Sequence, residues 1–237
     1  MKQEYLYGTL AAGGNVLGAL AVVSRARWSV RALDAMIALA AGFMMAVVVV
    51  EIFPEAIARG GTNAAAIALL GYMLVHLTQH TLVKHFHFGE ETHHVTQAVS
   101  LSALVGLMMH TIVDGVAIAS GFGVSHALGM LIFVAVLLHK FPEGLAISSL
   151  FLAAGQSRGR ALLAASALGA ATFVGVMVTN HIGVLREHGL ALSAGVTLYV
   201  GMSNLVPEFR RKGGWHLPFA FLGGTATYFA ARALAGA

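Results

Sequence analysis

Two histidine and carboxylate pairs stand out because each lies inside a long apolar stretch. His110 precedes Asp114 by four residues, and His139 precedes Glu143 by four. On a helix, this spacing places the imidazole and the carboxylate on one face, about one turn apart. These groups suit zinc, iron(II) or manganese(II), with cadmium as a mimic. A carboxylate in apolar surroundings is costly unless it is paired or coordinated, so the pairs predict a buried metal site.

The two stretches are joined by the short segment 121–126 and are therefore expected to form an antiparallel helical hairpin. In such a hairpin His110 lies level with Glu143, and Asp114 lies level with His139. At about 1.5 Å per residue, the four groups lie roughly 18 to 25 Å from the turn, near the middle of a bilayer. A lone histidine here is more often a core residue, but that interpretation does not account for two matched pairs at one depth.

The helices that position these pairs are predicted to span a membrane. Of the 237 residues, 58% are apolar and 10% are charged, with a mean hydropathy of +0.80, which excludes a soluble globule. The absence of cysteine excludes thiolate ligands. Runs of this length fit helices of roughly 20 residues, so we predict one all-α membrane domain, 1–237. The eight expected spans are about 6–23, 33–53, 64–83, 95–120, 125–154, 161–180, 190–206 and 217–235.

Charge and repeated boxes predict the topology. Nine basic residues fall in alternate loops against four on the opposite side, which places both termini outside the cytoplasm; the nine are Arg25, Arg27, Arg31, Lys84, Arg158, Arg160, Arg210, Arg211 and Lys212. A signal peptide is not expected, because no cleavage site is evident. The second and the seventh spans both close on Pro-Glu, at Pro54 and Pro207. This symmetry predicts inverted repeats in a 3+2+3 arrangement, although a proline can also simply end a helix.

These features together resemble the ZIP (Zrt/Irt-like) divalent metal transporters. The resemblance covers nearly the whole chain: eight spans, the box from His110 to Gly115, the box from His139 to Gly144, and the two Pro-Glu ends. It implies that the metal is a transported substrate rather than a cofactor and moves toward the cytoplasm. It also implies the ligand set His110, Asp114, His139 and Glu143.

Two positions depart from the members of that family that bind two metal ions. Thr111 stands where asparagine is usual, and Lys140 stands where an acid or amide often helps to hold a second ion. An ammonium group beside His139 repels a second dication, so we predict a site for one ion, with Lys140 partly balancing Asp114 or Glu143 when no metal is bound. The alternative is that Lys140 points away and either snorkels or pairs elsewhere.

Other residues are weaker candidates for the metal pathway. The predicted cytoplasmic loop 84–94 contains histidines that either capture released metal or form a solvated surface with no ordered site; these are His85, His87, His93 and His94. Glu51, Glu55 and Glu208 are candidates for lining vestibules, and solvation of helix ends explains them almost as well.

The leading prediction is transport of a divalent cation, with zinc first, that weakens as pH falls because the ligands must be deprotonated. An intramembrane zinc hydrolase is the alternative, but four protein ligands leave it neither an open position nor a spare acid. A proton-coupled exporter or a metal sensor with the same site remains open. The expected partners are the metal ion and the lipid of a cell membrane, which is the inner membrane if the source is bacterial. No nucleic acid is expected, and a homodimer is left open.

Overall fold

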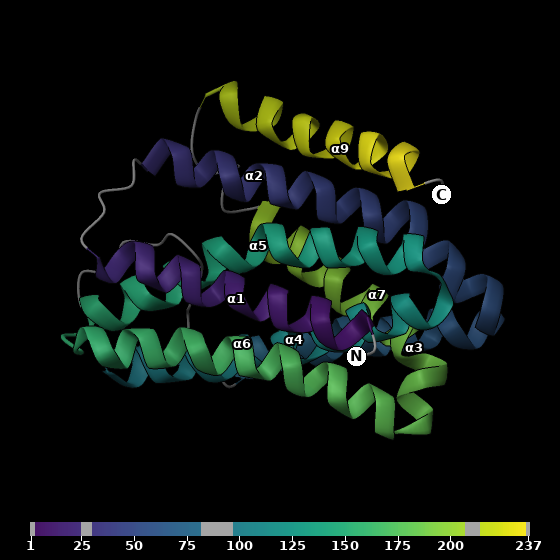
Figure 1. Cartoon of the computed structure of the whole chain (residues 1–237), viewed down its shortest axis with the longest axis horizontal. Coiled ribbons are helices and arrows are strands. Elements are labelled where there is room, and N and C mark those ends of the chain that lie inside the picture. The colour runs from purple at the N-terminus through teal and green to yellow at the C-terminus, as the bar shows by residue number, and fades with distance from the viewer. Residues whose placement is uncertain (1–2, 25–29, 82–96, 207–213, 236–237) are drawn as a thin grey trace.

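The computed structural model describes residues 3–24, 30–81, 97–206 and 214–235 (Figure 1). The regular structure in these ranges is helical, with no strand, as the sequence predicts for an all-α protein. Two short π-helical segments, η1 and η2, interrupt the α-helices. In chain order the elements are α1 (Gln3–Val23), α2 (Val30–Val47), η1 (Val48–Ile52), α3 (Phe53–Thr81), α4 (Gln97–Val124), α5 (His126–Ala153), α6 (Arg158–His181), α7 (Gly183–Tyr199), η2 (Val200–Leu205) and α9 (His216–Ala235).

Five helical stretches among the described residues are long and apolar enough to cross a membrane. One of them, Asp34–Gln79, has 46 residues, which at about 1.5 Å per residue is enough for two crossings of a core of about 30 Å. Its backbone breaks at Gly61, where φ is 55° and ψ is −141°. The expected second and third spans lie on either side of that break. Large apolar side chains such as Leu17, Leu70 and Leu163 are exposed, as a lipid-facing surface requires.

The two π-helical segments precede the two Pro-Glu boxes. In the first, the Phe53 N–H donates to the carbonyl of Val48, and in the second the Val206 N–H donates to the carbonyl of Gly201. Each bond reaches five residues back and ends at the residue before the proline. A wider turn accommodates the missing N–H and the ring of a proline, and the helix accordingly continues through Pro54 rather than ending there. The similarity between the two Pro-Glu boxes therefore includes the backbone geometry that precedes each box as well as its sequence.

The helices pack as two groups. Helices α1, α4, α5 and α6 contact one another, whereas α2 pairs with α9 and α3 pairs with α7. In Figure 1, α9 lies along the outer side of α2, and α1 runs between α5 and α6. The groups meet mainly where α5 contacts α2 and where α4 contacts α7. The predicted metal site lies in the first group, on α4 and α5, and faces the second.

Small residues set how closely α1 and α6 approach the site. A Cβ atom on Gly144, the residue after Glu143, would overlap the backbone carbonyl of Asn15 on α1. A Cβ atom on Gly115, the residue after Asp114, would overlap the carbonyl of Thr172 on α6. Gly115 and Gly144 are therefore points where two helices cross. Each crossing fixes the carboxylate beside it relative to a neighbouring helix.

Candidate metal site

The four predicted ligands lie together in the interior of the helix bundle, and each is at most 5% exposed. His110 Nε2 lies 3.3 Å from Glu143 Oε1, and His139 Nε2 lies 3.3 Å from Asp114 Oδ2. These are the two pairs that the hairpin predicts to lie level. The site therefore brings each imidazole into contact with one carboxylate across α4 and α5.

The hairpin has this register because its turn is tight. Helix α4 ends at Val124 and α5 begins at His126, so that Ser125 alone connects them. Ser125 caps α5, since its hydroxyl accepts the N–H of Leu128 at 3.1 Å. A one-residue connection leaves little freedom for the two helices to slide past each other.

Lys140 points into the site. Its side chain is fully buried, and Nζ lies 2.7 Å from Asp114 Oδ2 and 2.7 Å from Glu143 Oε2. The sequence predicts that Lys140 balances the charge of one of the two carboxylates, and in the structure it forms an ion pair with both. The alternative, in which this lysine snorkels to the membrane surface, is wrong for this structure.

Thr111 connects the lysine to the glutamate. Lys140 Nζ donates to Thr111 Oγ1 at 3.1 Å, and that hydroxyl donates to Glu143 Oε1 at 2.9 Å. The three hydrogens of the ammonium group thus find three oxygen acceptors, on Asp114, Glu143 and Thr111. Thr111 and Lys140 therefore act as one unit, because the threonine accepts from the lysine.

Sequence reasoning missed Asn15, a fully buried residue of α1 that also contacts the site. Its Nδ2 donates to Glu143 Oε2 at 3.2 Å and to the backbone carbonyl of Lys140 at 3.2 Å. Its Oδ1 is buried and has no hydrogen-bond partner. The sequence does carry a signal, since this is a lone amide between Gly14 and Gly18 in the otherwise apolar stretch 10–23.

His139 Nε2 and Asp114 Oδ2 face each other at 3.3 Å, and the tautomer of His139 decides whether a proton lies between them. His139 Nδ1 lies 2.9 Å from the carbonyl oxygen of Ala135, and the tautomer that donates there leaves Nε2 unprotonated toward Asp114. A cation satisfies both of these lone pairs. His110, Asp114 and Glu143 each offer a ligand atom within 4.8 Å of the others, which is compatible with one shared metal ion.

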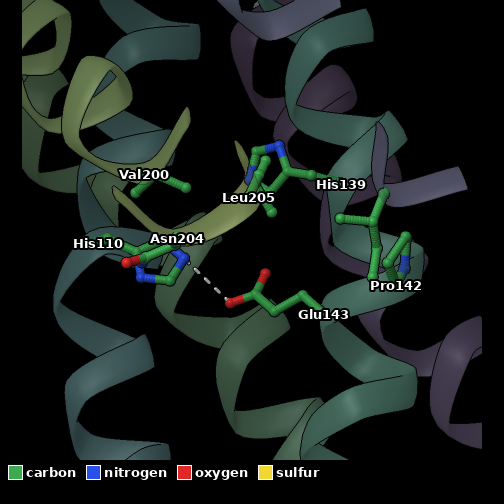
Figure 2. A pocket seen from close by; sticks show the side chains of 8 residues that line it. His110, His139, Pro142, Glu143, Val200, Asn204 and Leu205 are labelled. Atoms are coloured by element: carbon green, nitrogen blue, oxygen red, sulfur yellow. Dashed lines mark ion pairs between the residues drawn. The ribbon is translucent and has the colours of Figure 1, made fainter. Parts of the chain in front are cut away.

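Two small cavities adjoin the site. One, of about 30 Å³, is lined by His110, His139 and Glu143 together with Asn204 of η2 (Figure 2). The other, of about 10 Å³, is lined by Asp114 and His139 together with residues of α2 and Ile52 of η1. His139 borders both cavities, and each cavity reaches one of the two π-helical segments.

The remaining predicted residues lie elsewhere. Glu51 accepts a hydrogen bond from the hydroxyl of Tyr228 at 2.6 Å and pairs with Arg232 at 2.8 Å, both on α9. Glu55 pairs with Arg59, one turn along α3, at 2.6 Å on the surface. The other weak candidates fall outside the described residues: Glu208, His85, His87, His93 and His94.

The sequence was compared with known protein families and with curated proteins. A search of curated proteins finds no match to the chain. The model of one family, described as ZIP zinc transporter, matches residues 78–230, which include α4, α5 and the four predicted ligands. That match spans more than half of the 237 residues. The chain belongs to the ZIP zinc transporter family, and it is a multi-pass membrane transporter of divalent metal ions rather than an enzyme.

Proposed function

We propose that this transporter carries zinc toward the cytoplasm by binding it between His110, Asp114, His139 and Glu143. The observation that carries the proposal is the apposition of two imidazole nitrogens and two carboxylate oxygens at 3.3 Å in the bundle interior. Two carboxylates neutralise a dication, and two imidazoles complete a four-coordinate set. Without such a role, carboxylates buried in a membrane helix are expensive to maintain.

The donor set favours zinc and permits some other divalent metals. Nitrogen and oxygen ligands of this kind also bind iron(II) and manganese(II), and cadmium serves as a probe. Copper(I) prefers sulfur, and the chain contains no cysteine. None of the four proposed ligands is a methionine, the other residue that could supply sulfur. We therefore expect zinc, then cadmium, to bind most tightly.

Each chain is proposed to bind one ion at this site. The Lys140 ammonium group occupies the oxygens of Asp114 and Glu143 that a second dication would need, at 2.7 Å from each. Entry of the first ion displaces some of these contacts, because the carboxylates exchange an ammonium partner for a metal. A second ion would have to replace the ammonium altogether.

Movement of one helix group past the other is proposed to expose the site to alternate sides of the membrane. The four helices α1, α4, α5 and α6 pack together and include the site. Residues of α2, α7, η1 and η2 line its far side. An eight-span, 3+2+3 arrangement with both termini outside is supported by the matched π-helical segments and by the distribution of basic residues. We place the protein in the cell membrane.

The experiment is zinc uptake into proteoliposomes by the variant His110→Ala/His139→Ala. Loss of two direct ligands should exceed the roughly 10- to 100-fold effect of losing an outer partner of a metal site, so uptake should fall by more than about 100-fold. A matched control is His126→Ala/His181→Ala, which removes two exposed histidines at helix ends. Uptake that is equal in both double variants would refute the proposed site.

A further inference from the structure

The two carboxylate oxygens of Glu143 face different partners. Oε1 lies 3.3 Å from His110 Nε2 and accepts the hydroxyl of Thr111 at 2.9 Å, so it is directed toward α4. Oε2 accepts the ammonium group of Lys140 at 2.7 Å and the amide of Asn15 at 3.2 Å. One oxygen therefore faces the predicted ligand His110, while the second is held by Lys140 of α5 and Asn15 of α1.

We infer that Asn15 is a positioning residue that sets metal specificity by holding Oε2 of Glu143 away from the metal ion. With Oε2 held, Glu143 contributes only Oε1, and the site offers four ligand atoms, one from each predicted ligand. A four-coordinate site suits zinc, whereas manganese(II) prefers six mainly oxygen ligands. The inference rests on the proposed function and adds to it the residue that fixes the coordination number.

Lys140 also donates to Oε2 of Glu143, but Lys140 is a charged donor, whereas Asn15 is a neutral one. A dication repels the ammonium group, and the same ammonium also lies 2.7 Å from Asp114 Oδ2. The Asn15 amide is neutral and is not repelled when a metal ion enters. Its donor therefore remains on Glu143 in the metal-bound state, when restraint of Oε2 decides how the carboxylate coordinates.

The backbone holds Asn15 in this place. Its carbonyl lies against Gly144, where any Cβ atom would overlap it, and its Nδ2 also donates to the carbonyl of Lys140. Helix α1 is thus fixed against α5 on both sides of Glu143. The amide oxygen of Asn15 is buried without a partner, a cost that leucine, whose side chain branches in the same way, would not incur. Packing alone therefore does not explain an asparagine at this position.

The test compares Asn15→Leu and Asn15→Ala with Gly13→Ala, a neighbouring change of α1 into open space. Equilibrium binding of zinc and of manganese(II), and the visible spectrum of bound cobalt(II), are measured on the purified transporter. We expect zinc affinity to fall about 10- to 100-fold in both Asn15 variants, as for other outer partners of a metal site. Manganese affinity should fall much less, and cobalt absorption should weaken as its coordination number rises above four.

Each result decides between a positioning role and a structural one. A wild-type zinc-to-manganese ratio and cobalt spectrum in the Asn15 variants would overturn the inference. So would equal losses for both metals with an unchanged spectrum, which indicate a purely structural role. If Asn15→Leu does not fold, Asn15→Ala, which leaves space instead of filling it, decides the question. Zinc binding that survives His110→Ala/His139→Ala would instead refute the proposed function.

Discussion

Lys140 is the residue whose replacement tests most directly how many ions the site holds. In Lys140→Ala, the oxygens of Asp114, Glu143 and Thr111 lose the ammonium group that they now share. Loss of one member of a buried ion pair typically costs about 3 to 5 kcal/mol, so the metal-free variant should unfold at a lower temperature than wild type. Metal should restore the difference, and calorimetry should count two cadmium ions per chain instead of one.

The control for this change is Arg160→Ala, which removes an exposed cation that bonds Gln156 on the surface. It should bind one ion and unfold like wild type, because a surface charge contributes little. Two ions in wild type together with an unchanged count in Lys140→Ala would show that the ammonium does not determine the stoichiometry.

The contrast between His110 and Asn15 shows which parts of the site the sequence can predict. Both histidine pairs follow from a four-residue spacing and a short connection, predicted at 121–126, so their meeting depends on local geometry. Asn15 donates to a residue 128 positions away, through a contact that depends on how α1 packs on α5. The isolated amide marks the residue as unusual, but only the packing identifies its partner.

At the scale of the elements, the crossing of α1 and α5 depends on the absence of a side chain at Gly18. A Cβ atom there would overlap the carbonyl of Phe141 and approach the backbone nitrogen of Leu145 to 2.7 Å. Backbone atoms cannot rotate away, so Gly18→Ala should force the helices apart at a cost of about 1 to 3 kcal/mol. Thermal unfolding of the purified protein should show a lower midpoint, and zinc binding should weaken because Asn15 moves with α1.

Gly13→Ala serves as the comparison, since its Cβ atom meets nothing within 4 Å. Alanine is the better helix former by about 0.5 to 1 kcal/mol, so this variant should be as stable as wild type or slightly more stable. If Gly18→Ala and Gly13→Ala unfold at the same temperature, close packing at Gly18 does not limit the stability of the bundle.

Element boundaries were harder to predict than element type. The apolar runs indicate helices, and helices are what the described residues form. The Pro-Glu box, however, suggested a helix end at Phe53, whereas the helix continues to a break at Gly61. A proline normally stops a helix because it lacks an N–H, but the π-helical turn of η1 accommodates it. The Pro-Glu box marks the place of that turn, but the letters alone do not distinguish a helix end from a π-helical turn.

At the scale of the whole molecule, the proposed transport cycle requires the two helix groups to move relative to each other. Helix α4 of the first group contacts α7 of the second. A Cβ atom on Gly189 would lie 3.8 Å from the Cβ atom of Ser120, once the side chain of Val116, at 2.8 Å, has shifted to make room. That separation is close to the mean of about 3.8 Å found across disulfides. Because the chain contains no cysteine, Ser120→Cys/Gly189→Cys introduces one pair of thiols with no competing partner.

The oxidised double variant should still bind zinc, because its site on α4 and α5 is untouched, but its uptake into proteoliposomes should fall to background. Reduction should restore uptake, which separates the effect of the covalent link from that of the substitutions. The single variants Ser120→Cys and Gly189→Cys cannot form the link and should transport zinc under both conditions. Wild-type uptake by the fully oxidised double variant would mean that the two groups do not separate at this contact, and the site would then have to open by a motion confined to shorter segments such as η1 and η2.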